Sequence, residues 1–432
     1  MSASEIDHPV RLPLIGATRH ELPALAWSFA YFFCVLSAYY VIRPVREQFG
    51  AAAGGSAALP QIWLIVFLVM LALTPVYGAL VAHFPRRVFV PVVYLFFALG
   101  MLAIAPWLGD AAGSRLLATG FYVWVSVFNL FVVAVFWSFM ADVFTDQQAR
   151  RLFGAIGVGG TLGAMAGPAL AFALVHTIGV KGLLWISAFL LGLAMIASMF
   201  LGRWARHYGR RDPLLGERVI GGSLLAGARM VFQHPFLRRM AVLFLLSDLI
   251  GTVLYALNLD LGASLFHSAE DRTGFFARLD FLVNGAQILL QLFLAPWLLV
   301  RLGPALVLVL AAAFNALVLL GLVVFSGPFW LMAALVATRA GAYGLVAPAR
   351  ESLYTRVGRE ARFKAKGFID TVVWRGGDVA SSSLLAVLKS AGASLAQIGL
   401  LGVIAALLGV LFSRNVERLR GLDPEDESGS RT

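Results

Sequence analysis

The chain alternates between long apolar stretches and short polar ones. Each apolar stretch holds about 20 residues, which is the length a helix needs to cross the hydrocarbon core of a bilayer. Because backbone polar groups in lipid must be satisfied within their own segment, we interpret these stretches as transmembrane helices. The pattern predicts twelve of them, at 22–42, 60–82, 88–108, 117–141, 152–178, 182–202, 240–262, 276–300, 303–325, 328–348, 368–389 and 394–413.

The composition agrees with this interpretation. Hydrophobic residues make up 60% of the 432 positions and charged residues 13%, where roughly 25% is usual for a soluble domain. Mean hydropathy is +0.84. A soluble fold cannot bury that much apolar surface, so the numbers exclude a soluble enzyme, a disordered chain and a coiled coil. The fold class predicted is an all-α membrane protein.

The basic residues predict the orientation of the chain. Most of the 34 Lys and Arg fall in alternate polar segments, which the positive-inside rule places in the cytoplasm together with both termini. Basic loops facing anionic lipid account for most of the net charge of +11. We therefore expect a multi-pass protein of the bacterial cytoplasmic (inner) membrane, whose partner is the lipid bilayer and not a nucleic acid.

The longest internal polar segment divides the predicted helices into six and six. The end of span four, FMADVFT, echoes the end of span ten, ARESLYT, as duplicated halves would. This organisation predicts twelve transmembrane helices in two six-helix bundles, a major-facilitator-like architecture. The expected divisions are a cytoplasmic tail at 1–21, a first bundle at 22–202, a basic cytoplasmic linker at 203–239, a second bundle at 240–413 and a cytoplasmic tail at 414–432.

Charged residues near the end of span one are the first candidates for a binding site. An ionisable side chain at the bilayer centre costs about 2.5–3.5 kcal/mol or more, so such groups face the protein interior, pair, or line water. Tyr40, Arg43 and Arg46 share roughly one helix face. Two arginines there form a clamp for phosphate or carboxylate. The alternative is that both side chains reach out to the lipid headgroups.

Span eleven carries a second group of charges. Arg375 and Asp378 stand three positions apart and pair within one helix, either as part of a substrate site or as a self-satisfied structural ion pair. Asp370 is left over, and its expected counter-charge is Arg350, Lys366 or Arg339.

A third set of polar residues lies within spans seven, eight and ten. These residues line a cavity, take up a proton, or serve as interhelical hydrogen bonds that hold helices together. The candidates are Asp248, Asn258, Asp260, Asn284, Gln287 and Arg339.

No constellation in the chain predicts an enzyme. Gly159, Gly163 and Gly167 of span five form a small-residue stripe for close helix approach, and no GK[ST] follows to make a phosphate loop. The seven histidines show no metal-ligand spacing, and no hydrolase triad is evident. We expect no catalytic residues, no metal and no cofactor.

Three segments together resemble the ATP/ADP translocases of intracellular bacteria and plastids, a nucleotide-exchanger family related to the major facilitators. They are YYVIRPVREQF in span one, FWSFMADVFTDQQARRLFGAIGVGGTLG across spans four and five, and YGLVAPARESLYTRVGREARFKAKGFIDTVVWRGGD across spans ten and eleven. The third match is the longest and most specific. The family's basic and acidic positions keep the sign of their charge here, with Arg46, Glu47 and Arg350 replacing Lys, Asp and Lys.

The resemblance implies nucleotide exchange by alternating access, with basic residues holding the phosphates. It carries over to Arg43, Arg46, Glu47, Arg151, Pro348, Arg350, Glu351, Tyr354, Lys364, Lys366, Asp370 and Arg375. We predict that phosphates contact Arg43 and Arg46 from one half and Lys366 or Arg375 from the other. The acidic residues Glu47, Asp370 and Asp378 would hold these cations in the empty site, with Tyr40 beside them.

The function predicted is that of a secondary transporter, acting as a monomer, for a nucleotide or a similar phosphorylated or anionic solute moved by exchange. The alternative is a proton-coupled major-facilitator carrier of another small solute, with Asp248 or Asp260 as the proton site. A membrane scaffold or sensor is disfavoured because no soluble domain is present to carry a signal.

Overall fold

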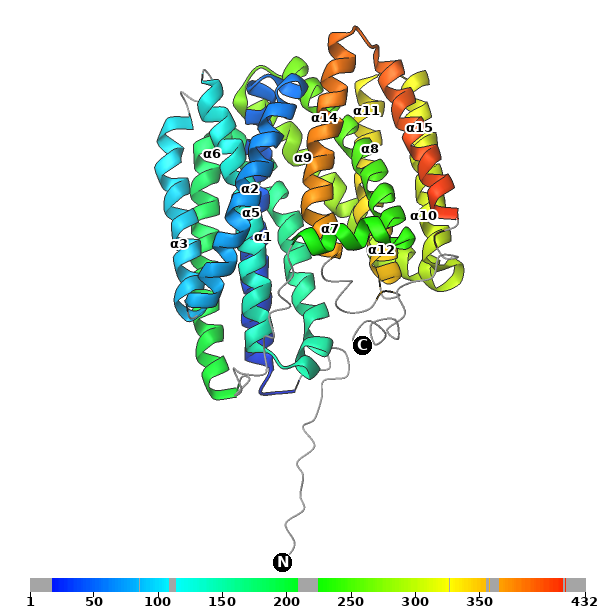
Figure 1. The fold of residues 1–432 in the computed structure, drawn as a ribbon. Coiled ribbons are helices and arrows are strands. Elements are labelled where there is room, and N and C mark those ends of the chain that lie inside the picture. The colour runs from blue at the N-terminus through cyan, green and yellow to red at the C-terminus, as the bar shows by residue number, and fades with distance from the viewer. Residues whose placement is uncertain are drawn as a thin grey trace, which may run out of the picture. The chain divides into compact units, whose positions relative to one another are not determined.

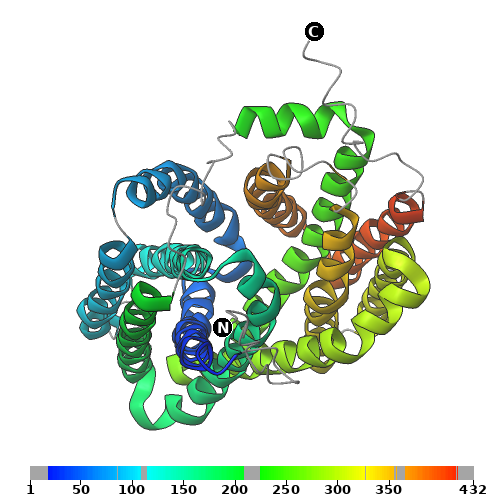
Figure 2. The same ribbon diagram turned by 90° about the horizontal axis from the view of Figure 1, so that it is seen from below.

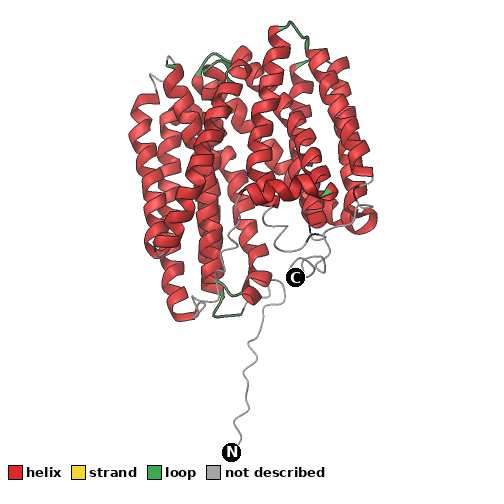
Figure 3. Cartoon of the chain, in the orientation of Figure 1, coloured by secondary structure: helices red, strands yellow, loops and turns green. Residues whose placement is uncertain are grey.

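The described part of the computed structural model is helical throughout, and it contains no β-strand (Figure 3). The predicted all-α fold is thereby confirmed. Most of the two predicted tails and the middle of the basic linker lie outside the described residues, as does Lys364. The structure describes residues 18–84, 86–108, 114–208, 224–325, 327–354, 357, 365–414 and 416.

The helices follow one another along the chain from α1 to α15 (Figure 1). Most are α-helices, η1 and η2 are short 3-10 helices, and η4, η5 and η6 are π-helical turns. Their bounds are α1 Leu22–Ala52, η1 Gly55–Ala57, α2 Leu59–His83, α3 Arg86–Ile104, η2 Ala105–Trp107, α5 Arg115–Val143, α6 Asp146–Tyr208, α7 Leu224–Gln233, α8 Pro235–Leu265, α9 Ala269–Leu289, η4 Leu290–Leu294, α10 Ala295–Val324, α11 Pro328–Gly341, η5 Ala342–Val346, α12 Ala347–Tyr354, η6 Ile369–Val373, α14 Trp374–Ser390 and α15 Leu395–Arg414.

Every predicted apolar segment is helical in the structure, although several of them extend over more than one of these elements. Spans five and six are the two parts of α6, which breaks at Gly179 (φ 68°, ψ 177°). Spans eight and nine run from α9 through η4 into α10, which breaks at Gly303 (φ 75°, ψ 161°). Side chains with a Cβ avoid that backbone region, so glycine is needed at both breaks. The first helix runs ten residues beyond its predicted end, because α1 continues through Pro44 to Ala52.

The helices suit a lipid solvent. Among the described residues, nine helical segments are long and apolar enough to cross a membrane, and two of them, Gln147–Arg206 and Ala269–Val324, have the length of two passes. Large apolar side chains such as Phe293, Leu317 and Phe329 are more than two-thirds exposed. An exposed apolar surface of this kind is typical of a protein that contacts lipid.

The chain divides into two compact units. The first comprises Met1–Arg46, Val69–Glu217 and Ser268–Arg278, and the second comprises Glu47–Leu68, Arg218–His267 and Leu279–Thr432. The short segments Glu47–Leu68 and Ser268–Arg278 therefore group with the half of the sequence opposite to their own.

In the first unit, α6 packs closely against α1 through the predicted glycine stripe. A Cβ on Gly159 would come within 2.6 Å of the Phe29 carbonyl oxygen, and one on Gly163 within 2.4 Å of the Phe33 carbonyl oxygen. Ser187 of the same helix donates a 2.7 Å hydrogen bond to the backbone oxygen of Ala38. The prediction of close helix approach at this stripe is confirmed.

In the second unit, α15 lies along α10, as the red and yellow-green helices show when viewed from below (Figure 2). The helix α8 contacts α11, α14 and α15. The short helix α7 lies crosswise to the long helices beside the start of α8 (Figure 1).

Three π-helical turns interrupt the helices of this unit. One of them, η5, ends just before the Pro348 region of α12, and another, η6, contains Asp370. Single π-turns widen a helix locally and are frequent at functional sites. Both turns adjoin residues of the third motif.

Candidate functional site

In the first unit, the α1 arginines lie against aromatic rings. Arg43 is 7% exposed, and its guanidinium lies 5.4 Å from the centre of the Tyr40 ring. The guanidinium of Arg46 lies 4.9 Å from the centre of the Tyr122 ring, and its Nη1 donates to Ser126 Oγ at 3.5 Å. Ring faces stabilise cations. Both guanidinium groups therefore lie among protein side chains.

Glu47 follows these arginines in the sequence but belongs to the second unit, and it contacts other residues of that unit. It is 3% exposed and accepts a short hydrogen bond from the Tyr255 hydroxyl of α8. Tyr255 stacks on Trp63 with ring centres 5.5 Å apart. The Arg339 guanidinium lies 5.7 Å from the centre of the Tyr255 ring. This cluster joins the end of α1 to α2, α8 and α11.

The third motif brings four charged residues of the second unit together. Lys366 pairs with Glu351 at 2.7 Å, and the Arg350 guanidinium lies 4.4 Å from the centre of the Phe244 ring. Asp370 interacts electrostatically with Arg350, Lys366 and Glu351. This arrangement agrees with the prediction that Arg350 or Lys366 is the counter-charge of Asp370. The third predicted partner, Arg339, lies instead beside Tyr255.

The span-eleven pair forms as the spacing predicts. Arg375 Nη1 lies 3.0 Å from Asp378 Oδ2 within α14, and the same guanidinium lies 5.1 Å from the centre of the Trp374 ring. Asp248 of α8 interacts electrostatically with Asp378 and Arg375. Three ionisable groups from two helices thus meet at one place.

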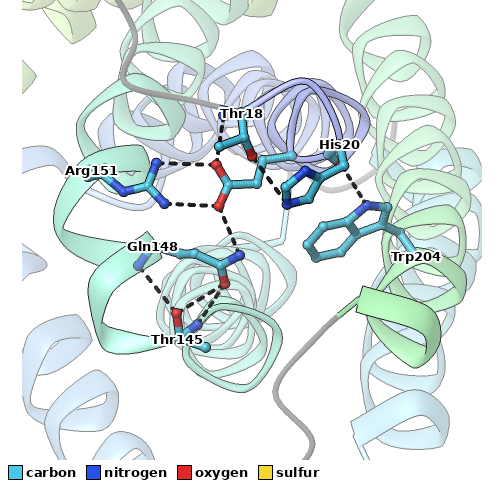
Figure 4. Close-up of polar contacts among 7 residues, drawn as sticks. Thr18, His20, Thr145, Gln148, Arg151 and Trp204 are labelled. Atoms are coloured by element: carbon cyan, nitrogen blue, oxygen red, sulfur yellow. Dashed lines mark hydrogen bonds and ion pairs between the residues drawn. The ribbon is translucent and has the colours of Figure 1, made fainter. Parts of the chain in front are cut away.

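Arg151 occupies a different setting. Its guanidinium makes a bidentate contact with Glu21, with Nη2 at 2.9 Å from Oε1 and Nη1 at 3.2 Å from Oε2 (Figure 4). Gln148 donates to the same carboxylate at 3.0 Å, and the Thr18 backbone N–H at 2.9 Å. Thr145 and Gln148 bond each other at the start of α6, a form of capping box.

This network decides the ionisation of Glu21, which lies just before the first apolar span. Burial by itself raises the pKa of the Glu21 carboxyl group, but hydrogen bonds from Arg151, the Thr18 backbone and Gln148 outweigh it and lower the pKa to about 2. The Arg151 side chain therefore ties the first turn of α1 to α6 in this structure. Its predicted part in substrate binding stays a prediction.

Two of the predicted cavity residues have structural contacts. Asn258 Nδ2 donates to the backbone oxygens of Leu254 at 2.9 Å and Leu331 at 3.3 Å, so it links α8 to α11. Asp260 accepts hydrogen bonds from Ser56 N at 2.7 Å and Ser56 Oγ at 2.6 Å, and it forms an ion pair with Lys389. Asn258 thus matches the alternative of an interhelical hydrogen bond.

The polar residues Asp280, Asn284 and Gln287 of α9 are buried or half-buried in the second unit. Asp280 and Asn284 are each 5% exposed, and Gln287 is half-buried one turn further on. The role of Asn284 and Gln287 as cavity residues stays a prediction.

Sequence reasoning missed the aromatic partners of the cations. Tyr122, Trp63 and Phe244 each lie against a charged or polar residue of the candidate site, yet in the sequence they are aromatic residues among many others. Tyr122 and Ser126 stand four positions apart on one face of α5, which is the one local signal that could have pointed to Arg46.

The helical fold, its apolar exterior and its buried cations define a multi-pass membrane transport protein. The chain belongs to the Major Facilitator Superfamily, whose family model matches residues 29–381. This match confirms the predicted superfamily relationship.

Similarity to known proteins extends along most of the chain. An "ADP,ATP carrier protein 1" of Chlamydia trachomatis is 25% identical over 87% of this chain and 84% of its own length. The protein of the same name from Chlamydia pneumoniae is 24% identical over 87% of both chains. The predicted resemblance to ATP/ADP translocases is confirmed by these relatives.

Solved structures share the fold at low identity. A bacterial homologue of the iron transporter ferroportin in its inward-facing state superposes with a TM-score of 0.65, 16% identity, and coverage of 92% of this chain and 99% of its own. The nucleoside transporter NupG superposes with a TM-score of 0.60, 13% identity, and coverage of 93% and 100%.

Proposed function

We propose that this chain exchanges nucleotides, or closely similar organic phosphates, across a membrane by alternating access. Its similarity to two chlamydial ADP,ATP carrier proteins over 87% of its length makes ATP and ADP the first substrates to test. The residues proposed to bind phosphate are Arg43 and Arg46 of α1, together with Arg350, Lys366 and Arg375 of the second unit. We propose transport and no catalysis, so the nucleotide leaves chemically unchanged.

The observation that carries this proposal is the position of the α1 arginines. Arg43 is almost fully buried in a mostly apolar helix, and Arg46 is held half-buried against Tyr122. Cations kept inside an apolar helix are costly, so a function that needs them is the expected reason for their presence. Guanidinium groups bind phosphate through two parallel hydrogen bonds, a geometry that suits the polyphosphate of a nucleotide.

The acidic residues fit the same scheme. Glu351 contacts Lys366, and Asp378 contacts Arg375, at 2.7 Å and 3.0 Å. Each carboxylate neutralises a cation while no substrate is bound, and an incoming phosphate replaces it. The net cost of entry is then an exchange of ion pairs, which keeps binding reversible.

Exchange is tested in proteoliposomes made with the intact chain and loaded with ATP, with ADP or with no nucleotide. Uptake of labelled ATP should require internal nucleotide. Replacing Arg46 by Ala removes a charge-assisted contact worth about 1.5–3 kcal/mol, so the apparent affinity for ATP should fall by about tenfold to a hundredfold.

Arg301→Ala is a matched control. Arg301 also lies over an aromatic ring, 5.1 Å from the centre of Trp297, but it is exposed. This variant should transport normally. Uptake that ignores internal nucleotide, or an Arg46→Ala protein as active as Arg301→Ala, contradicts the proposal.

We further propose that the chain works as a monomer in the bacterial inner membrane with both termini in the cytoplasm. The predicted bundles at 22–202 and 240–413 and the linker at 203–239 belong to this proposal. A cysteine introduced at position 220 should be protected from an impermeant reagent added outside intact cells. Labelling there from outside would overturn the orientation.

A further inference from the structure

The short helix α7 of the second unit has two different faces. It lies crosswise to the long helices beside the start of α8 (Figure 1). Val231 is 3% exposed and belongs to a buried cluster that also contains Phe236 and Leu237 of α8. The next residue, Phe232, is 69% exposed, and Arg229 is exposed three positions before it. Residues three apart share a helix face, so α7 is held to the unit on one face and presents an arginine and a phenylalanine on another.

The turn from α7 into α8 adds further positive charge. His234 is the single residue between the two helices, and α8 begins at Pro235. One turn into α8, Arg238 is exposed and Arg239 is half-buried. Residues 218–247 contain four arginines and no aspartate or glutamate. The exposed arginines of this turn therefore have no carboxylate close by in the sequence, and their charge suits an anionic partner.

This turn lies at the end of the lipid-facing surface of the second unit. The buried cluster around Val231 also contains Ala305, which follows the break in α10, and Leu353 near the end of α12, so these helix ends meet at one end of the unit. On α10, apolar side chains stay exposed almost up to the break, with Val300 at 85% and Trp297 at 48%. Aromatic residues gather where hydrocarbon meets the headgroups. The level of α7 is therefore that of the membrane interface.

The charges alone do not account for this surface. The positive-inside rule requires basic residues near the ends of the spans, and an exposed apolar side chain beside them adds nothing to it. In water, the Phe232 ring would keep its unfavourable apolar hydration. At the boundary between headgroups and acyl chains, the ring of an interfacial helix enters the apolar region while its arginines stay among the phosphates.

We propose that α7 and the first turn of α8 form an interfacial binding surface for anionic phospholipid. Headgroup phosphates bind Arg229 and Arg238, and the Phe232 ring lies among the acyl chains beside them. Guanidinium groups suit this partner because they bind phosphate through paired hydrogen bonds. The partner is a lipid of the bilayer and not the transported solute, so this inference goes beyond the proposed function and does not depend on it.

Spin labels test the depth of α7 in the membrane. Cys34 is the single cysteine of the chain, so a full-length Cys34→Ala background takes one label at a time. In vesicles of phosphatidylcholine and phosphatidylglycerol, a label on Phe232→Cys should be relaxed more by oxygen, which dissolves in lipid, than by a water-soluble nickel chelate. Leu317→Cys, 68% exposed on α10, is the lipid control, and Asp271→Cys, exposed at the start of α9, is the water control. A label at position 232 that behaves like the one at 271, or that neither reagent reaches, overturns the proposal.

Lipid selectivity tests the arginines. Native mass spectrometry of the full-length protein, titrated with either lipid in detergent, should show tighter binding of phosphatidylglycerol than of phosphatidylcholine. Combining Arg229→Gln with Arg238→Gln should reduce this preference by about twentyfold, since each basic residue at an anionic surface contributes about fivefold. Combining Arg229→Lys with Arg238→Lys keeps the charge and should retain most of the preference. Arg278→Gln is the control, because Arg278 is an exposed arginine of α9 in the first unit, and it should bind like the wild type.

Two results of the lipid titration would overturn the proposal. One is a preference for phosphatidylglycerol that survives in the double glutamine variant with an unchanged melting temperature. The other is displacement of the lipid by an equal concentration of inorganic phosphate, which would make this surface a site for free phosphate. Neither readout needs a nucleotide. If nucleotide exchange fails while the lipid preference depends on these arginines, the proposed function fails and the lipid surface stands.

Discussion

The ion pair between Glu21 and Arg151 should make a measurable contribution to the stability of the first unit. The Glu21 side chain is 4% exposed and accepts hydrogen bonds from Arg151, Gln148 and the Thr18 backbone. Replacing Glu21 by Gln keeps the shape and part of the hydrogen bonding but removes the charge that Arg151 binds. The first turn of α1 would then lose its anchor on α6.

The pKa of Glu21 sets the magnitude. The folded protein holds this pKa at about 2, against an ordinary value of 4.5. A difference of about 2.5 units corresponds to about 3 kcal/mol of stability at neutral pH. Because the folded pKa is depressed, this contribution is present above pH 4.5 and is lost as pH falls from 4.5 towards 2.

Thermal unfolding of the purified protein in detergent measures this contribution. Glu21→Gln should lower the free energy of unfolding by about 3 kcal/mol at neutral pH, and its difference from the wild type should shrink as the solution is acidified below pH 4.5. A double-mutant cycle with Arg151→Met isolates the pair, with an expected coupling energy of about 2–3 kcal/mol.

The exposed pair of Lys366 and Glu351 provides the comparison. Its side chains are 35% and 48% exposed, so the same cycle there should give about 0.2–1 kcal/mol. If the Glu21–Arg151 coupling is no larger than that of the exposed pair, the reasoning from burial and hydrogen bonding is refuted.

Two further predictions concern packing and the turn between α1 and α2. Gly163→Ala should destabilise the protein by about 1–3 kcal/mol, because the new Cβ would lie 2.4 Å from the Phe33 carbonyl oxygen. Gly192→Ala is the control and should be neutral or stabilising, because no atom lies within 4 Å of the Cβ added there. Equal melting temperatures for the two variants would contradict this prediction. Asp260→Ala should cost about 1–3 kcal/mol by leaving the Ser56 N–H without its acceptor. Lys389→Met should cost less, about 0–1 kcal/mol, because the ion pair is one-third exposed; a larger loss in Lys389→Met than in Asp260→Ala in thermal unfolding would reverse this assignment.

Part of the candidate site was readable from local sequence. Arg375 and Asp378 pair as their spacing predicts, and Asp370 lies near Arg350 and Lys366 as expected. These contacts follow from helix periodicity or from short separations along the chain. Asp260 was a candidate proton site, but the structure shows it bound to Ser56 and Lys389, residues 204 and 129 positions away. No local pattern could have paired them.

The sequence by itself determined the class of this protein. A helix that crosses lipid needs a fixed length and must satisfy its backbone hydrogen bonds within itself. Hydropathy alone therefore specifies the helices, and few charged residues remain inside the apolar segments. Only the tertiary structure decided which charges meet. Asp248 of α8 and Gly377 of α14 are far apart in the chain, yet a Cβ on Gly377 would lie 2.9 Å from Asp248 Oδ2, so the glycine lets α14 approach α8 at this carboxyl group. Side-chain chemistry at such a site depends on the distance between helices, which the periodicity of each helix does not contain.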